Sequence, residues 1–212
     1  MGDKSSHKCL IIACGAIAGE IVQLQRQLSY SKEAFTLKCL PADYHNTPQK
    51  IAPAIEKILM AQRDQFDVVL VGYGDCGTGG KLDAVLEKYD ASRLPGAHCY
   101  EFFAGAQLFG DIIEEELGSF FVTDYLVKFF DRLVIKGLGL DRYPHLYEIY
   151  FANYKRVVYL AQEDNPILFK KAQAAAHKLG LQFHYQKVGY GDLEIALKTF
   201  PLKTVGAHNV SG

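Results

Sequence analysis

The sequence has no excess of charge of either sign, and this absence excludes several classes of protein. Its 212 residues include 23 lysines and arginines against 24 aspartates and glutamates, which gives a net charge of −1. Lysine and arginine never occur in a run longer than two residues. Nucleic-acid-binding proteins use concentrated positive charge to engage phosphates. We therefore expect no nucleic-acid partner.

Long hydrophobic runs are also missing. The longest apolar stretches have the length of a β-strand, whereas a membrane-spanning helix needs about 20 apolar residues. The N-terminal segment lacks the apolar core of a secretory signal. We therefore predict a cytoplasmic protein that does not cross a membrane, with residues 1–7 as a flexible N-terminus.

The cysteines do not occur in C-x-x-C pairs, and their number is odd. In a reducing cytoplasm, such a set indicates buried thiols, metal ligands or reactive groups rather than a disulfide framework. Two of the five lie inside expected strands, and we assign them to the core. The core pair is Cys9 and Cys39, and the other three are Cys14, Cys76 and Cys99.

Short β-branched runs alternate with segments of helical spacing, and hydrophobic residues make up 49% of the chain. This alternation is typical of a parallel sheet with helices on both faces. We predict a single-domain, three-layer, Rossmann-like α/β fold over residues 8–200, followed by a C-terminal tail, 201–212. The expected strands are residues 9–14, 35–40, 67–71, 93–100, 119–122, 157–160 and 181–188. The expected helices are residues 17–28, 48–62, 102–117, 124–138, 144–154, 167–179 and 192–200.

Capping residues mark several of these helix ends. Thr47 before Pro48 and Asn165 before Pro166 are typical of helix starts. Gly180 is typical of a helix end in the left-handed conformation. These signals make the helices around them the clearest predictions in the sequence.

Cysteine and histidine residues follow four of the expected strands. The first strand ends at Cys14, the second leads to His45, the third leads to Cys76, and the fourth contains His98 and Cys99. In open α/β sheets, ligands bind outside the carboxyl ends of the strands. Thiolate and imidazole together suit zinc, an iron–sulfur cluster or another transition metal. We therefore expect a zinc or iron–sulfur site at this edge of the sheet.

The fourth ligand and the metal itself stay open at this point. Cys99 is the preferred ligand from its loop, because neighbouring residues of an extended segment point to opposite sides. His98 or His45 then completes the set. The alternative is that the cysteines only pack at strand ends, where small thiols are often buried.

A glycine-rich loop follows the third strand. Gly72-x-Gly74-x-x-Gly77 matches the dinucleotide fingerprint, but that fingerprint belongs to the first strand-to-helix turn, so we do not adopt it. Glycines at strand ends allow the backbone to approach a cofactor closely. We expect this role for four glycines, namely Gly15, Gly74, Gly77 and Gly79.

Three carboxylates are candidate catalytic residues. Glu20 lies in the expected first helix, Asp75 follows the third strand, and Asp124 follows the strand at residues 119–122. Each can act as a general base or orient a metal-bound histidine. A solvated or capping role is the competing interpretation for each of them.

An ordered set of short motifs resembles a known family. The motifs are LIIACGAIAGEI, CLPADYHNTPQKI, VVLVGYGDCGTGG, LPGAHCYEFFAGAQLF and FANYKRVVYLAQ. Over residues 8–200 they are similar to the bacterial and archaeal domain-of-unknown-function family 1638. The family pattern falls on Cys14, His45, Cys76, His98 and Cys99. The resemblance implies a context of corrinoid-dependent methyltransferases, with the corrinoid held by a partner protein.

Three hypotheses about function follow. The first is a metalloprotein that catalyses or assists methyl-group transfer in corrinoid-linked one-carbon metabolism. The second is a non-catalytic module that binds a small molecule or a partner, with structural thiols. The third is a thiol enzyme in which Cys76 lies at a helix N-terminus with His98 or His45 as base. An aromatic stripe at residues 143–154 is assigned to the core or to a homo-oligomer interface.

Overall fold

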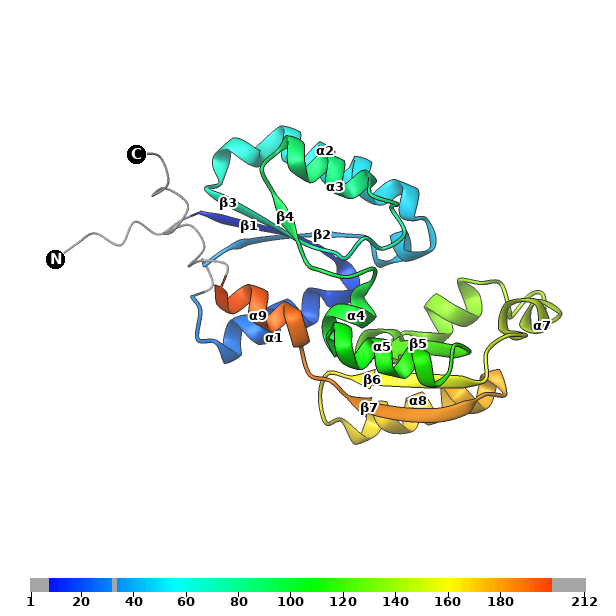
Figure 1. Ribbon diagram of the computed structural model, residues 1–212. Coiled ribbons are helices and arrows are strands. Elements are labelled where there is room, and N and C mark those ends of the chain that lie inside the picture. Colours follow the sequence, from blue (N-terminus) through cyan, green and yellow to red (C-terminus); the bar gives the residue numbers. More distant parts are fainter. Residues whose placement is uncertain (1–7, 32–33, 200–212) are drawn as a thin grey trace. The chain divides into compact units, whose positions relative to one another are not determined.

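The computed structural model describes residues 8–31 and 34–199, which form two compact units. Unit 1 contains the described residues up to Phe102 together with 192–199, and unit 2 is Phe103–Gly191 (Figure 1). Within the described ranges, no helix combines the length and the apolar content needed to cross a bilayer.

Unit 1 is built on a parallel sheet with the strand order β2-β1-β3-β4. The inner strands are continuously apolar, as expected for strands covered on both faces; Ile11 of β1 pairs with Leu37 of β2 and Leu70 of β3. The strands are β1 (Cys9–Cys14), β2 (Thr36–Leu40), β3 (Val68–Gly72) and β4 (Ser92–Arg93).

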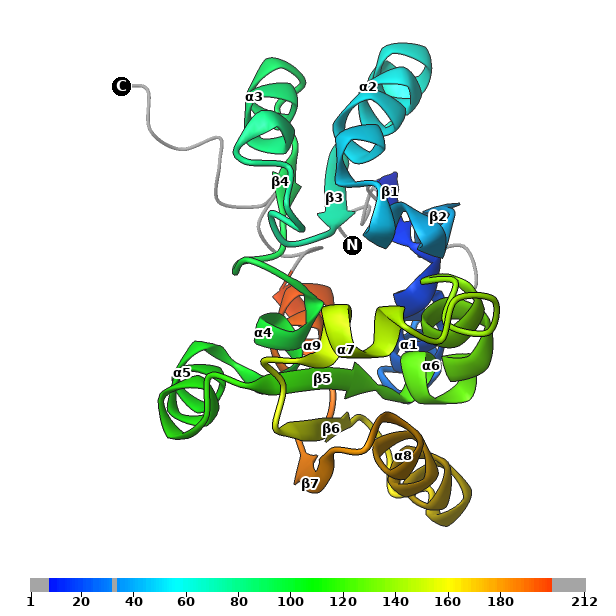
Figure 2. The same cartoon turned by 90° about the vertical axis from the view of Figure 1, so that its right-hand side faces the viewer.

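Helices cover both faces of this sheet. In Figure 2, α2 and α3 rise from one face, while α1 and α9 lie against the other (Figure 2). One core packs α2 and α3 on side chains of β1 and β3, including Ile12, Val71, Ile55 and Leu86. The α-helices are α1 (Ala18–Gln27), α2 (Ile51–Gln62), α3 (Lys81–Lys88), α4 (Cys99–Ala104) and α9 (Gly191–Thr199). Short 3-10 turns are Gly15–Ile17, Ala42–Asn46, Pro48–Lys50 and Arg63–Gln65.

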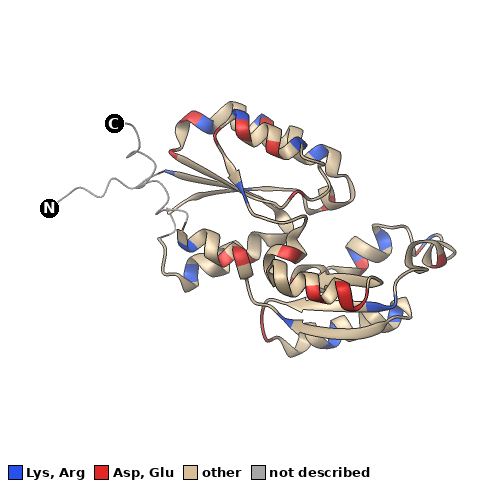
Figure 3. Cartoon of the chain, viewed as in Figure 1, with Lys and Arg blue, Asp and Glu red and all other residues tan. Residues whose placement is uncertain are grey.

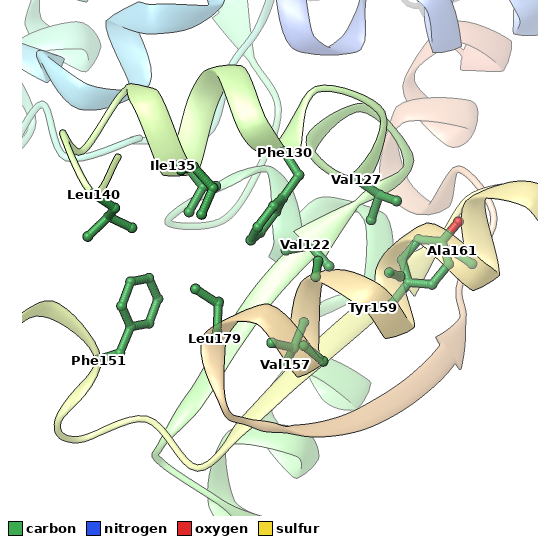
Figure 4. Packing of buried hydrophobic residues seen from close by; sticks show 14 residues of the cluster. Val122, Val127, Phe130, Ile135, Leu140, Phe151, Val157, Tyr159, Ala161 and Leu179 are labelled. Atoms are coloured by element: carbon green, nitrogen blue, oxygen red, sulfur yellow. The ribbon is translucent and has the colours of Figure 1, made fainter. Parts of the chain in front are cut away.

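Unit 2 has a second parallel sheet, with the order β5-β6-β7. Its main core lies on one face, where Val122 and Val157 of the sheet meet Phe130 and Leu179 of the helices (Figure 4). On the opposite face, Phe109 of α5 contacts Phe121, with 5.0 Å between the ring centroids. The strands are β5 (Ser119–Thr123), β6 (Arg156–Ala161) and β7 (Gln182–Lys187). The helices are α5 (Ala106–Glu115), α6 (Asp124–Lys128), the π-helix Asp131–Lys136, α7 (Leu146–Phe151) and α8 (Pro166–Leu179).

The predicted α/β class, with parallel strands and helices around them, is confirmed. The strands form two sheets in two units, where the sequence analysis expected one sheet in one domain. No linker of unusual composition separates the strands of the first sheet from those of the second. The seven strands therefore form one continuous pattern in the sequence. The expected termini, residues 1–7 and 201–212, lie outside the described residues.

Three expected elements and one expected helix cap differ from the structure. The expected helix at 124–138 is divided into α6 and the π-helix. Residues 93–100 do not form one strand, because β4 ends at Arg93 and α4 begins at Cys99. The expected helix at 102–117 is interrupted at Gly105, whose φ of +81° is not helical. Thr47 makes no side-chain capping bond. Asn165 does cap α8, accepting hydrogen bonds from the amides of Ile167 and Leu168 at 3.0 and 3.1 Å.

Candidate functional site

The sheet of unit 1 changes direction between β1 and β3. From β1 the chain connects to the neighbour on one side, β2, and from β3 it connects to β4 on the other. In open α/β sheets this switch point creates a crevice outside the carboxyl ends of the strands, and ligands bind there. Cys14 is the last residue of β1, and Tyr73 and Cys76 follow β3 directly. Residues from both sides of the switch point therefore reach the same edge.

Three thiols interact at this edge, and we call Cys14, Cys76 and Cys99 the thiol cluster. All three are partly buried. Cys76 and Cys14 both raise the pKa of Cys99, and Cys14 raises that of Cys76, so the three sulfur atoms lie within electrostatic reach of one another. The structure thus brings together the three cysteines that the strand-end argument selected.

Each thiol in the cluster is held in its neutral form. Burial is the largest cause: it raises the pKa of Cys14 and Cys99, and it raises that of Cys76 to about 11. The Cys14 sulfur accepts a hydrogen bond from the Ala16 amide at 3.4 Å, which opposes this effect. A thiol with a pKa near 11 is a poor nucleophile at neutral pH, because almost none of it is thiolate.

A buried tyrosine hydroxyl lies beside the thiol cluster. Tyr73 is only 3% exposed, and its hydroxyl lies next to the Cys14 thiol. Its electrostatic partner is the Cys14 thiol, but among the described residues no group completes a hydrogen bond of regular geometry with that hydroxyl. A buried polar atom without a partner is uncommon and costs free energy. The hydroxyl therefore indicates a site where a ligand atom can complete the contact.

The segment that carries Cys99 is pinned to the loop after β3. The amides of Asp75 and Cys76 donate to the carbonyls of Gly96 and Ala97 at 3.0 and 2.7 Å. A Cβ at Gly74 would lie 2.8 Å from the Gly96 carbonyl oxygen, so only glycine permits this approach. These backbone contacts set Cys76 and Cys99 side by side.

His45 and His98 come together around an aromatic ring. Tyr100 lies 6.4 Å from His45 and 6.0 Å from His98 between ring centroids. Burial lowers the pKa of His45, and the neighbouring His98 lowers it further. A neutral imidazole is the form that binds a metal ion. The two histidine ligands that we predicted are therefore near each other.

Asp75 supports the loop. Its Oδ1 accepts hydrogen bonds from the Thr78 hydroxyl at 2.8 Å and the Gly80 amide at 3.0 Å, and its Oδ2 accepts one from the Gly79 amide at 3.1 Å. These bonds lower the pKa of the carboxyl group. Asp75 therefore holds the turn at residues 78–80, directly before α3, and does not cap the helix itself. Cys76 does not lie at a helix N-terminus as the third hypothesis required, because α3 begins at Lys81.

The other two predicted carboxylates lie in different units. Glu20 is on α1, where its charge raises the pKa of Cys14. Asp124 belongs to unit 2, where its Oδ1 accepts bonds from the Tyr159 hydroxyl at 2.7 Å and the Gln162 amide at 3.1 Å. Its Oδ2 accepts a bond from the Glu163 amide at 3.1 Å. Within unit 2, Asp124 ties the end of β5 to the end of β6.

The four predicted glycines serve the local backbone. A Cβ at Gly15 would lie 3.0 Å from the Leu40 carbonyl oxygen, so Gly15 fits closely against β2. Gly77 and Gly79 adopt φ values of +78° and +61°. Gly79 has open space around its Cα, so the loop is accessible there. A role in holding a cofactor stays a prediction for all four.

The two cysteines assigned to the core differ. Cys9 is buried at 4% exposure, as predicted. Cys39 is exposed, so its assignment to the core is wrong. The reason is that β2 is an edge strand of the sheet, and alternate side chains of an edge strand can face solvent.

No group of three or more His, Cys, Asp or Glu side chains is already arranged as a metal-binding centre in the parts of the chain that the structure describes. The thiol cluster is therefore a set of protonated sulfur atoms that lie near one another. Protons must leave these atoms before they bind a cation. The donor set itself suits a soft metal ion, because thiolates prefer zinc, copper(I) and iron–sulfur clusters.

Together, the fold and the site define an α/β protein with a thiol cluster at the switch point of a parallel sheet. The family model described as "Protein of unknown function (DUF1638)" matches residues 39–197. The chain therefore belongs to the DUF1638 family, as the motifs predicted. The match contains His45, Cys76, His98 and Cys99 and begins after Cys14. No curated protein matches the chain.

Two aromatic residues of the site were not singled out from the sequence. Tyr73 reads as part of an apolar strand end, and Tyr100 reads as part of an aromatic helix. Neither carries a local signal, since tyrosine usually serves packing. Tyr73 lies between two glycines at the end of a buried strand. This position is the sequence feature from which Tyr73 could have been predicted as a site residue.

Proposed function

We propose that this protein is a metalloprotein whose thiol cluster binds zinc or an iron–sulfur cluster, with His45 or His98 as the fourth ligand. The observation that carries the proposal is that three thiols from three separate segments interact at the switch point of the sheet. Packing alone does not require three thiols from separate segments at the one edge where parallel sheets bind ligands.

The buried hydroxyl of Tyr73, which lies next to Cys14, supports the same proposal. A metal-bound thiolate at Cys14 can accept a hydrogen bond from this hydroxyl, which would satisfy the buried donor. In the thiol form, Cys14 competes as a donor itself and is a weak acceptor. The side chains present therefore fit a cation-bound thiolate better than a neutral thiol.

We further propose that the site serves methyl-group transfer, with a corrinoid held by a partner protein as methyl donor. A bound metal ion supplies one chemical property here, a lowered pKa for an incoming thiol. Transfer then breaks the cobalt–carbon bond, leaves its electron pair on cobalt, and forms a carbon–sulfur bond. The thiol proton would leave to a base, and whichever of His45 and His98 does not hold the metal is the candidate for that role.

Elemental analysis tests metal binding. We expect one zinc ion, or iron with sulfide, per chain in protein purified without oxygen. Serine at Cys14, Cys76 or Cys99 should remove most of the metal with the fold retained by circular dichroism. Cys39→Ser and Cys9→Ser are matched controls that remove an exposed and a buried thiol outside the cluster. Full metal content in the three cluster variants would overturn the proposal.

Absorbance spectroscopy with methylcobalamin and a small thiol tests methyl transfer. Under anaerobic conditions we expect cob(I)alamin to accumulate with the metal-loaded protein and not with Cys76→Ser. If the protein binds metal but transfers no methyl group, the proposal of methyl transfer is overturned and the proposal of a metal site is kept. Absence of both metal and transfer would favour the alternative of an accessory module with structural thiols.

A further inference from the structure

Unit 2 contains a cavity of about 400 Å³ between the segment after β5 and helix α8. The first side contributes residues of α6 and of the π-helix, and the second contributes one face of α8. The lining residues are Val127, Lys128, Phe129, Phe130, Asp131, Arg132, Lys171, Ala174, Ala175 and Lys178. This volume lies in the range of about 300–1,000 Å³ that is usual for small-molecule sites.

The rim of the cavity is strongly basic. Lys128, Arg132, Lys171 and Lys178 line it together with one carboxylate, Asp131. Figure 3 shows Lys and Arg positions on α8 (Figure 3). For the protein as a whole, positive and negative charges nearly cancel, so four cations around one cavity are a local concentration. Such a concentration attracts anions.

Most of this positive charge is not neutralised. Lys178 pairs with Asp131 at 2.6 Å. Arg132 donates a hydrogen bond to the Tyr125 hydroxyl at 3.2 Å, which leaves its charge uncompensated. Among the described residues, neither Lys128 nor Lys171 forms an ion pair with a carboxylate. Three of the four cations can therefore engage an external anion.

The floor of the cavity is apolar and partly aromatic. Val127 and Phe130 are buried parts of the core of unit 2, and both are labelled in Figure 4. The Phe129 ring contacts two of the cations, with Arg132 at 4.5 Å and Lys128 at 5.5 Å from its centroid. Cations over an aromatic face are attracted to it. The cavity thus combines an apolar floor with adjacent positive charge.

The first two residues of the π-helix at Asp131–Lys136, Asp131 and Arg132, line the cavity. Such helices are rare and often occur at functional sites, because the extra residue in the turn widens the backbone. A Cβ at Gly137 would collide with the Leu133 carbonyl oxygen, so glycine is needed where this turn ends. The end of the π-helix therefore depends on glycine at position 137.

We propose that this cavity binds a small molecule that carries at least two negative charges beside a planar apolar body. The charges meet Lys128, Arg132 and Lys171, and the apolar body lies on the floor that Val127 and Phe130 line. Phosphate and carboxylate groups both satisfy this chemistry. The site belongs to unit 2 and is independent of the thiol cluster.

Titration with phenyl phosphate and with phthalate tests the proposal and separates the two anion sources. We expect one saturable site per chain by isothermal calorimetry, with affinity falling as salt rises. Lys171→Glu should weaken binding at least about tenfold, since one favourable charge pair becomes unfavourable. Lys170→Glu is the matched control, because it makes the same change on α8 outside the cavity and should stay within about twofold.

Ala174→Phe tests the cavity itself, because it fills the space and leaves every charge in place. We expect it to abolish binding while the far-ultraviolet spectrum is retained. Equal effects of Lys170→Glu and Lys171→Glu would overturn the proposal, as would full binding by Ala174→Phe. Binding of polyglutamate without binding of phenyl phosphate or phthalate would also overturn it and would identify a surface for an acidic chain.

Discussion

Cys76 adopts a backbone conformation that favours glycine, with φ at +50°. For a residue with a side chain, this left-handed conformation costs about 1–2 kcal/mol. Strain of this kind is often found at functional sites, where the side chain is needed in spite of it. The loop already contains several glycines, and a glycine at position 76 would avoid this strain. The cysteine therefore provides a thiol group at a position where it lowers stability.

Replacing Cys76 with glycine should separate stability from function. We expect Cys76→Gly to change the free energy of unfolding by less than about 1 kcal/mol, because relief of strain offsets the entropy of the new glycine. The same variant should lose its metal. Urea denaturation and elemental analysis give the two quantities. A large destabilisation would instead assign Cys76 to packing.

Metal affinity should rise with pH. The pKa values of Cys14, Cys76 and Cys99 lie above their ordinary range, so these thiols keep their protons at neutral pH, and the metal must displace them. We expect zinc affinity, measured with a competing chelator, to increase from pH 6 to 9, a window that runs up toward the raised pKa of about 11 for Cys76. An affinity that is flat across this window would contradict thiolate ligation.

Asp124 should act on stability. Removing its carboxylate leaves the Tyr159 hydroxyl and the amides of Gln162 and Glu163 without their acceptor. Each unsatisfied buried group costs about 1–3 kcal/mol. We expect Asp124→Ala to lower the free energy of unfolding more than Tyr159→Phe, which removes one of these bonds. Equal effects of the two variants in urea denaturation would contradict this assignment.

At the scale of elements, the segment after β5 departs most from the sequence pattern. One helix was expected at 124–138, but α6 ends at Lys128 and a π-helix follows from Asp131. The apolar residues Val127, Phe130 and Val134 all belong to the same core. Helical spacing therefore predicted a helix in this segment but could not reveal the wider turn, which brings Val127 into the core in place of Phe129 and Leu133.

Gly137→Ala tests the π-helix. The added Cβ collides with the Leu133 carbonyl oxygen, so we expect a lower melting temperature and weaker binding of phenyl phosphate. Gly110→Ala in α5 is the matched control, because its added Cβ meets nothing within 4 Å. In an ordinary helix, glycine to alanine stabilises by up to about 1 kcal/mol. Stabilisation by both variants would contradict a requirement for glycine at 137.

Elements with strong local signals could be predicted from the sequence. β1 has the expected bounds because it is a continuous apolar run that ends before a glycine, and α8 is capped by Asn165 and Gly180 as expected. The region around 93–105 could not be predicted, because backbone contacts between distant loops hold it. The approach of Cys14 and Cys76 was predictable from the geometry of parallel strands, but the position of Cys99 at the start of α4 and the hydroxyl of Tyr73 were not.

At the scale of the whole molecule, two units with separate cores carry two separate candidate sites. Hydrogen exchange should therefore respond to each ligand within one unit. We expect zinc to slow exchange near residues 10–17 and 69–80 of unit 1, and phenyl phosphate to slow it near 125–137 and 168–178 of unit 2. Protection that spreads equally over both units for either ligand would contradict separate sites.

Helix α9 gives unit 1 a particular order of assembly. Its buried residues Leu193 and Leu197 complete the unit, and the Tyr30 hydroxyl donates to the Leu197 carbonyl at 3.1 Å. The ribosome releases the whole of unit 2 before this helix. During synthesis, the first hundred residues therefore lack the apolar contacts of α9 until unit 2 has been made, and a chain that terminates before residue 191 never gains them.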